Sequence, residues 1–378
     1  MDMESAEDRD AARQGRPAAL VMALVLAAGL MSSLAAIFSD KGEALIAGAS
    51  VEALLDGEAT TKLARLLNED LIGGHELATA ARALDWLALS DLGPQVRRGC
   101  GNWLFLREEL DIHRDGASAS SRRVAMAVGV QSLLAARGIH LVVAITPDKS
   151  RIKADALCRV VRPDSLVGRF DAFAAGLSAA GIDTVDLRAA LSSAAEGGYY
   201  RTDTHWSEAG ARAAAEAIAR HLEAEGKAPA RGAEVPVVAG EVKERVGDLI
   251  RLAGLDGVSP PLRPEGDIVA TSTITLPAIV ADDLFGDMAG PPVAVIGSSY
   301  ARTANFIGFL AAALAVPVAD MAREGAGFAG AAVPYFADGA FTATPPQVVV
   351  WEIPERILDA PLTEQERAWE TRLAGGAL

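Results

Sequence analysis

The sequence has little cysteine, few histidines and few aromatic side chains, and these shortages exclude several classes of protein. Two cysteines, Cys100 and Cys158, are too few for a disulfide-rich scaffold or a four-cysteine zinc site. They are compatible with one bridge in an oxidising compartment or with two buried thiols. The histidines show no HExxH or other clustered ligand spacing, so we expect no metal site and no cofactor. They are His75, His113, His140, His205 and His221.

Positive charge is also scarce. The chain has 35 lysines and arginines against 50 aspartates and glutamates, a formal net charge of -15. Proteins that bind nucleic acid present a basic footprint to the phosphates, so we expect no nucleic-acid partner. The acidity is typical of a solubilising surface, and a polyanionic substrate would have to meet a local basic patch.

One long uncharged stretch lies near the N-terminus. Residues 18–38 carry no charge and are long enough, as a helix, to span a bilayer. Arginines precede the stretch, which predicts a cytoplasmic segment at 1–17 and export of the chain after residue 38. A cleaved signal peptide is the alternative, because Ser33-Leu34-Ala35 resembles a processing site. We favour an uncleaved anchor, since the apolar run is longer than a usual signal core.

The remaining sequence alternates apolar runs of strand length with helical patterns. This alternation predicts an α/β domain at 99–360, after a helical lead-in at 39–98 and before a C-terminal tail at 361–378. Residues 226–290 break the rhythm and are expected to form an insertion of small β elements. The predicted strands are 103–106, 139–145, 184–187, 292–296 and 348–353, and the predicted helices are 119–137, 164–180, 208–224 and 300–315.

A buried strand followed at once by small residues and a helix is the strongest local signature. Residues 293–301 read VAVIGSSYA, a pattern that exposes a serine at the carboxyl edge of a sheet. Gly297 permits the turn and Ser299 is placed to attack, with the helix start available to stabilise an oxyanion. Two alternatives remain open, Ser298 as the nucleophile or both serines as helix caps.

The second signature is an Asp-x-His in a loop that feeds a helix. Residues 199–207 read YYRTDTHWS, and an extended backbone would point Asp203 and His205 into one cleft. His205 would then take a serine proton, and Asp203 would fix its tautomer and stabilise the imidazolium. Ser207 is expected to cap the following helix, and a plain helix-entry loop is the structural alternative.

The order of these residues along the chain separates the possible folds. An α/β-hydrolase places its histidine after the nucleophile, whereas no histidine follows His221 here. A chymotrypsin-like order fits no better, because the sequence predicts an α/β domain and not an all-β one.

Taken together, these residues resemble the alginate O-acetyltransferases of the AlgJ/AlgX type, in the SGNH-hydrolase-like group. The resemblance covers about residues 50–360 and is closer to AlgJ, because little chain follows Arg356. The matching stretches are Gly101–Phe105, Pro147–Lys149, Tyr200–Trp206, Gly297–Tyr300 and Trp351–Arg356. One departure is Gly-Ser-Ser-Tyr where the family usually has Gly-Thr-Ser-Tyr.

The resemblance implies a flavodoxin-like parallel sheet with helices on both faces and a permuted motif order. It also implies a catalytic triad of Ser299, His205 and Asp203. The expected reaction is acetyl transfer through an acetyl-serine to hydroxyls of an exported, alginate-like polysaccharide. The expected acetyl donor is a membrane-bound O-acyltransferase, and the expected location is the periplasmic face of the inner membrane, or the periplasm if the N-terminal segment is cleaved.

Three further residues are candidates for substrate binding. Lys149 would lie near the site, and Trp206 and Tyr300 flank the triad and could stack on sugar rings, although core packing is an equal interpretation. Asn305 is a guess for a second oxyanion donor. A polysaccharide acetyl esterase with the same triad, and a non-catalytic subunit of an export complex, are the alternative functions.

Overall fold

The computed structural model describes residues 4–70, 74–276 and 290–376. The chain divides into two compact units, Met1–Leu84 and Asp85–Leu378. The boundary falls inside helix α5 (Gly74–Leu89), somewhat before the predicted domain start at residue 99.

The first unit is helical throughout its described part, as predicted for the lead-in. Its elements are α1 (Glu4–Ile37), α2 (Asp40–Ala47), α3 (Val51–Leu55), α4 (Glu58–Asp70) and the start of α5. The serine hydroxyls of Ser39 and Ser50 cap α2 and α3 by accepting from backbone N–H groups.

The predicted single membrane span at 18–38 is not confirmed. Within the described residues, no one helix meets the length and hydropathy expected of a membrane span. Met22–Ile37 and Asp40–Ala47 meet them only as a pair, with a 65° bend between them, and a signal sequence would meet them as well. The large apolar side chains between Met22 and Leu34 are nonetheless exposed within the unit, with Leu26 at 65% and Met31 at 67%.

The second unit is built on a five-stranded parallel sheet, which confirms the predicted α/β class. The strand order is β4-β3-β9-β7-β8, and every neighbouring pair is parallel. The strands are β3 (His140–Thr146), β4 (Asp183–Asp186), β7 (Val293–Ile296), β8 (Val318–Asp320) and β9 (Val348–Pro354). Uninterrupted apolar runs such as 348–351 suit strands that are buried on both faces.

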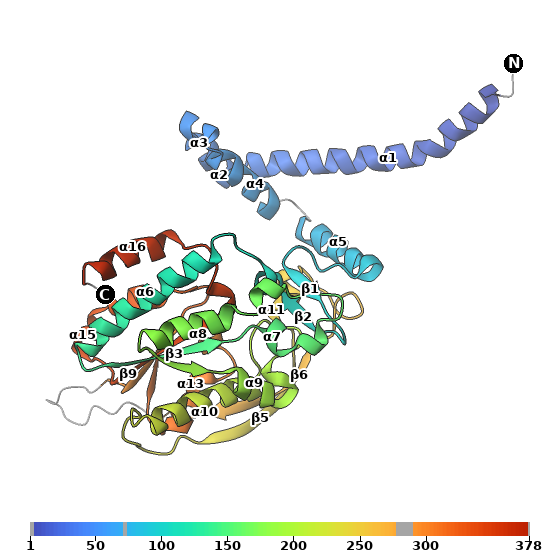
Figure 1. Cartoon of the computed structure of the whole chain (residues 1–378). Helices are drawn as coiled ribbons and strands as arrows, with labels where there is room; N and C mark the ends of the chain where they lie inside the picture. The colour runs from blue at the N-terminus through green and yellow to red at the C-terminus, as the bar shows by residue number, and fades with distance from the viewer. Residues whose placement is uncertain (1–3, 71–73, 277–289, 377–378) are drawn as a thin grey trace. The chain divides into compact units, whose positions relative to one another are not determined.

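Helices cover both faces of this sheet (Figure 1). Alternate residues of β3 enter different cores, Val143 on one face and Val142 on the other. The first core is completed by α6 (Gly116–Ala135), α8 (Arg169–Ala179), α14 (Ala332–Phe336), α15 (Gly339–Ala343) and α16 (Glu364–Ala374). The second is completed by α9 (Arg188–Ser193), α10 (Glu208–Ala224), α12 (Ser299–Arg302) and α13 (Phe306–Leu314).

Several predicted elements differ from the observed ones. The strand at 103–106 is β2 (Leu104–Leu106), which pairs with β1 (Val96–Arg98) in a separate hairpin and not in the main sheet. The helix at 300–315 is broken into α12 and α13, because Ala304 and Asn305 adopt φ values of 54° and 58°. Strand β8 was not predicted, since it has only three residues.

The segment 361–378 was expected as a tail, but it contains α16. A capping box between Thr363 and Glu366 begins this helix, and Trp369 is fully buried in the first core. Arg123 of α6 donates to Glu366 at 2.8 Å, with both side chains buried. This part of the chain therefore belongs to the folded unit.

The insertion at 226–290 contains a β hairpin, as predicted. Strands β5 (Val237–Arg245) and β6 (Asp267–Ile274) pair antiparallel, and α11 (Asp248–Leu252) lies between them in the chain. Residues 277–289 of the predicted insertion lie outside the described residues.

Short segments complete the unit. They are α7 (Lys149–Ile152), η1 (Arg107–Leu110), η2 (Ala154–Ala156), η3 (Asp164–Leu166), η4 (Ala195–Gly198) and η5 (Glu355–Ile357). Cys100 and Cys158 form a disulfide with a Cα–Cα distance of 5.6 Å, which is the first of the two alternatives that the sequence left open.

Candidate active site

The serine turn lies at the carboxyl end of β7, beside the central strand β9. Glycine is needed at position 297, because a Cβ there would lie 2.8 Å from the Cβ of Glu352. The buried Glu352 carboxylate accepts from the backbone N–H and from the hydroxyl of Ser298, both at 2.8 Å. Burial raises the pKa of Glu352. Ser298 is thus tied to the sheet, and the next side chain, Ser299, is the one that reaches the neighbouring loop.

That loop is not extended as expected but turns back on itself, and contacts at both of its ends hold it. Tyr199 and Trp206 form an isolated antiparallel bridge, and the Tyr199 hydroxyl donates to the carbonyl of Pro147. Ser207 caps α10 by accepting from the N–H of Gly210 at 3.2 Å. A Cβ on Gly210 would lie 2.0 Å from the carbonyl oxygen of Gly198, so the loop and the helix start approach closely. These contacts leave Asp203 and His205 on one side.

Ser299, His205 and Asp203 lie in one hydrogen-bonded line. Ser299 Oγ is 2.8 Å from His205 Nε2, and His205 Nδ1 is 2.7 Å from Asp203 Oδ1. Asp203 Oδ1 also accepts from the backbone N–H of His205 at 3.0 Å. Nδ1 faces a carboxylate and therefore carries the proton, which leaves the Nε2 lone pair to accept from the serine hydroxyl.

The second oxygen of Asp203 is bound by residues of the insertion. Arg245 donates to Oδ2 from Nη2 at 2.8 Å and from Nε at 3.2 Å, and the N–H of Asp248 donates to it at 3.2 Å. Burial alone would raise the pKa of Asp203, but the hydrogen bonds from His205 and the charge of Arg245 outweigh it and hold that pKa well below its usual range.

Arg245 and Asp248 were missed by sequence reasoning. With Ser299, His205 and Asp203 they line a pocket of about 380 Å³, which Arg251, Thr303 and Glu324 also border. The available signal was Gly247 between them, since a Cβ there would lie 2.0 Å from the carbonyl oxygen of Thr202. The insertion thus packs its backbone against the backbone of the loop at 199–207, which carries the proposed catalytic Asp203 and His205 and is called the catalytic loop below. No local sequence pattern reveals this contact.

The predicted substrate-binding residues Lys149, Trp206 and Tyr300 are buried and do not line the pocket. Lys149 is fully buried, and its ammonium donates to the carbonyls of Leu104, Arg201 and Asp203 at 2.6 to 2.9 Å. Burial lowers the pKa of Lys149 to about 8. The side chain is therefore committed to holding the loop, and a sugar contact by Lys149 is not supported.

Trp206 and Tyr300 pack as core residues do. Trp206 is 0% exposed and stacks on Phe306 with ring centroids 4.9 Å apart. Tyr300 is 1% exposed, donates to the carbonyl of Thr204 and meets the ring of His205 edge-on at 5.1 Å. Neither ring offers a face to a sugar in this structure. The Asn305 amide, the guess for an oxyanion donor, instead donates to Glu208 and to the Ser272 carbonyl.

Among the described residues, one group has ligand atoms close enough together to suggest a cation. These are Asp203, His205 and Asp248, within 4.8 Å of one another. The guanidinium of Arg245 already pairs with Asp203 at 2.8 Å, so a positive charge is present at this position. The donor set fits a histidine oriented by acceptors better than it fits a metal ligand shell.

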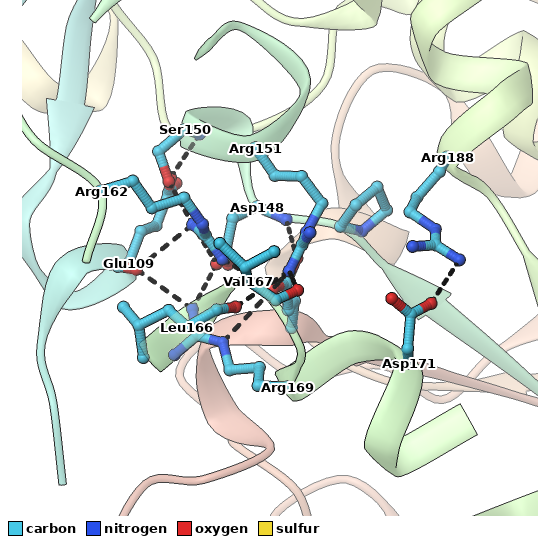
Figure 2. A network of polar contacts seen from close by, with 12 residues as sticks. Glu109, Asp148, Ser150, Arg151, Arg162, Leu166, Val167, Arg169, Asp171 and Arg188 are labelled. Atoms are coloured by element: carbon cyan, nitrogen blue, oxygen red, sulfur yellow. Dashed lines mark hydrogen bonds and ion pairs between the residues drawn. The ribbon is translucent and has the colours of Figure 1, made fainter. Parts of the chain in front are cut away.

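A second charged cluster lies at the carboxyl ends of β3 and β9. Figure 2 shows Asp148 surrounded by arginines, and Arg162 donates to it at 2.9 Å while Arg169 donates from the other side. Glu355 accepts from Arg151 and from Arg162 at 2.6 and 2.7 Å. We call Asp148, Glu355, Arg151, Arg162 and Arg169 the arginine cluster.

Comparison with known proteins agrees with this geometry. A family model described as an SGNH hydrolase-like domain, acetyltransferase AlgX, matches residues 96–355. The probable alginate O-acetylase AlgJ of Pseudomonas aeruginosa is 34% identical in an alignment of 314 positions that covers 77% of this chain and 78% of that protein. The solved O-acetyltransferase domain of Pseudomonas putida AlgJ is 30% identical, with a TM-score of 0.66 over 75% of this chain and 99% of that domain. Pseudomonas aeruginosa AlgX, at 20% identity and a TM-score of 0.56 over 74% of this chain and 65% of that structure, shares the fold. The chain belongs to the AlgX family of SGNH hydrolase-like acetyltransferase domains.

Proposed function

We propose that this acetyltransferase carries an acetyl group on Ser299 and passes it to hydroxyls of an exported, alginate-like polysaccharide. The observation that carries the proposal is the line Ser299 Oγ, His205 Nε2, His205 Nδ1 and Asp203 Oδ1, with steps of 2.8 and 2.7 Å, at the wall of a pocket. Relatives named as alginate O-acetylases support the choice of polysaccharide.

The first half-reaction loads the serine. His205 Nε2 takes the proton of Ser299 while Oγ attacks the carbonyl carbon of the acetyl donor. The imidazolium that forms keeps its Nδ1 proton, which is hydrogen-bonded to Asp203. It gives the Nε2 proton to the leaving group as the bond between the leaving group and the acetyl carbon breaks. Acetyl-Ser299 and neutral His205 remain.

The second half-reaction repeats these steps with the acceptor. A sugar hydroxyl gives its proton to His205 Nε2 as its oxygen attacks the acetyl carbon, and the ester bond to Ser299 Oγ breaks. The proton then returns to Ser299 Oγ. If water reaches the acetyl-enzyme instead, the same residues make an esterase, and that is the alternative function. A non-catalytic export subunit would not need this line of residues.

The test is an acetyl-transfer assay with 4-nitrophenyl acetate as donor and oligouronates as acceptors. Wild type should release nitrophenol and acetylate the oligosaccharide, and mass spectrometry should place an acetyl group on the peptide that contains Ser299. Ser299→Ala should abolish both reactions with an unchanged fold, whereas Ser298→Ala should lose about tenfold or less. Full activity in Ser299→Ala, or an adduct on Ser298, would contradict the proposal.

Transfer and hydrolysis are separated by the fate of the acetyl group. A transferase should partition acetyl to the oligosaccharide at the expense of free acetate as acceptor concentration rises. Acetate release that does not respond to acceptor, together with removal of acetyl from acetylated oligosaccharide, would favour the esterase.

We further propose that the domain works on the periplasmic face of the inner membrane and receives acetyl from a membrane-bound O-acyltransferase. The support is the uncharged stretch at 18–38, its preceding arginines and the Cys100–Cys158 disulfide, which is expected in an oxidising compartment. An alkaline phosphatase fusion at the C-terminus should be active in cells. An active cytoplasmic reporter in its place would exclude this topology.

A further inference from the structure

A second carboxylate faces the imidazole of the triad. His205 Nδ1 is 2.7 Å from Asp203 Oδ1 and 3.6 Å from Asp248 Oδ2. The second distance is too long for a hydrogen bond, but it is short enough for an ion pair once the ring is protonated. Asp248 belongs to the insertion, so its approach to His205 is set by tertiary packing and not by the Asp-x-His motif.

The position of Asp248 is fixed by the catalytic loop. Its Oδ1 accepts from the backbone N–H of Thr204 at 2.6 Å and from the Thr204 hydroxyl at 3.0 Å. Its own N–H donates to Asp203 Oδ2 at 3.2 Å. Three contacts to two consecutive loop residues leave Oδ2 as the oxygen that faces His205. Such an arrangement holds a charge at a defined distance from the ring.

The charges of Asp203, Arg245, Asp248 and His205 sum to zero only when the ring is protonated. Asp203 is paired with Arg245 through two hydrogen bonds to Oδ2, so their charges largely cancel. Asp248 then supplies the net negative charge nearest to Nδ1. With an imidazolium at His205, the four groups sum to zero.

Among the other groups nearby, Lys149 adds a buried positive charge, because its ammonium donates to the Asp203 carbonyl at 2.9 Å, and the carboxylates of Glu109 and Asp267 act on that ammonium as well. Tyr300 meets the ring edge-on, and burial raises its pKa well above the usual value, so it stays neutral. Ser299 is neutral, and the pocket wall adds one arginine and one glutamate, Arg251 and Glu324. Burial and the charge of Asp203 raise the pKa of Asp248, because two neighbouring carboxylates repel each other.

We propose that Asp248 is a positioning residue of the acetyl-transfer reaction, whose carboxylate stabilises the imidazolium form of His205. This inference rests on the proposed acetyl transfer through Ser299. When Ser299 gives its proton to Nε2, positive charge develops on the ring, and the Nδ1 proton stays on the ring, hydrogen-bonded to Asp203. Asp248 contributes by Coulomb attraction at 3.6 Å and neither takes nor gives a proton. Arg245 opposes it, because its positive charge partly neutralises Asp203.

The experiment compares the pH dependence of kcat/KM for 4-nitrophenyl acetate in the full chain. The acidic limb of such a profile reports protonation of the base in the free enzyme. Asp248→Asn removes a negative charge beside the ring, so the limb should move to lower pH by about one unit, and the plateau should fall about tenfold. The amide can still accept from Thr204, so the loop contact is kept.

Arg245→Gln should move the limb in the opposite direction, to higher pH, because it removes a positive charge. Arg245→Lys keeps the charge and should restore the wild-type limb. Asp256→Asn is the matched control, since this aspartate is exposed, lies in the same insertion and does not border the pocket. It should give the wild-type profile.

The result that overturns the proposal is a folded Asp248→Asn protein whose limb stays in place, even if its rate falls equally at every pH. If Asp248→Asn does not fold, Arg245→Gln is the test that remains. An acidic limb that does not move in Arg245→Gln would show that these charges do not set the protonation of His205, and the proposal would be rejected. The proposed function fails separately, through activity in Ser299→Ala. If Ser299→Ala is inactive and the acidic limb of Asp248→Asn does not move, the proposed function stands and only the role of Asp248 is rejected.

Discussion

Asp203 and Asp148 are both buried aspartates held by arginines, yet their surroundings push their pKa values in opposite directions. Asp203 is hydrogen-bonded to His205 and to Arg245, and these two hold its pKa well below the usual range. Asp148 meets two arginines, but full burial and the charge of Glu355 raise its pKa to about 7. One lies at an open pocket, and the other lies in the closed arginine cluster (Figure 2).

The comparison shows that an ion pair at the carboxyl end of a sheet strand does not by itself mark a site. In the arginine cluster each arginine is used to fix a chain segment, as Arg151 does for the carbonyls of Leu166 and Val167. In the pocket, Arg245 fixes a carboxylate that in turn orients an imidazole. The first arrangement stabilises the fold, and the second stabilises one protonation state of a single side chain.

The largest effect should come from His205→Ala. We expect kcat/KM for acetyl esters to fall by about 10⁴-fold or more, because a serine without its base is a poor nucleophile. The urea midpoint should change little, since the ring is only partly buried. Asp203→Asn should fall by about 10³- to 10⁴-fold, and the two losses should not add in the double mutant. Additive losses would mean that the residues do not act as one unit.

Glu355→Gln should do the reverse and damage the fold while sparing the chemistry. Removing one partner of a buried ion network leaves unpaired charge, at a cost of about 3–5 kcal/mol in the free energy of unfolding. Urea denaturation followed by tryptophan fluorescence measures this, because every tryptophan lies at position 86 or beyond, within the second unit. The exposed Glu364→Gln is the control, and its change should stay within about 0.5 kcal/mol. An equal change in both variants would remove the distinction between the arginine cluster and the pocket.

Lys149→Met should fall between these two cases. The ammonium holds carbonyls of β2 and of the catalytic loop, so its loss leaves buried acceptors unpaired and should cost about 2–3 kcal/mol of stability. Since one of those carbonyls belongs to Asp203, we also expect kcat to fall while KM for the ester stays within a factor of about two. A raised KM with unchanged kcat would return Lys149 to the substrate-binding role that the structure does not support.

The smallest effect for a single step of the experiment is the change in the free energy of unfolding with each unit of pH, through Asp148. A carboxyl with a raised folded-state pKa stabilises the fold below its unfolded value near 4, and this contribution is lost as pH rises to about 7. Wild type should therefore lose about 1 kcal/mol relative to Asp148→Asn for each unit of pH between about 4 and 7. For Asp203, whose pKa is lowered, the loss should instead occur as pH falls below about 4. Parallel pH curves for wild type and Asp148→Asn would show that Asp148 is ionised throughout this range.

Much of this arrangement could be predicted from sequence, because it depends on local signals. Uninterrupted apolar runs predicted the buried strands, and the turn at 297–299 and the Asp-x-His loop predicted the residues that the fold brings together. The spacing of Ser207 predicted the start of α10 at Glu208. In each case the signal lies within a few consecutive residues, although the contact between Ser299 and His205 joins segments 94 residues apart.

The remainder depended on contacts between distant segments. Arg245 and Asp248 approach the triad through Gly247 against Thr202, a contact between two loops about 45 residues apart in sequence. Lys149 was expected near the site as a substrate-binding residue, but its ammonium is buried and donates to the carbonyl of Leu104, 45 residues earlier in the chain. The break between α12 and α13 comes from left-handed backbone at Ala304 and Asn305, in a stretch whose apolar pattern alone predicts a continuous helix. Periodicity carries no information on any of these contacts.

The place of β9 in the sheet has a consequence for how the molecule is made. It is the last strand in the chain and the central one, with β4 and β3 on one side and β7 and β8 on the other. A ribosome or translocon that has released only the first 340 residues has produced two separate strand pairs with apolar edges and no bond between them. Such sheets form late and slowly, because their pairings join distant parts of the chain. The growing polypeptide therefore depends on protection of those edges until β9 emerges, and premature termination before the end of β9 at Pro354 should yield aggregate and not a weakened enzyme.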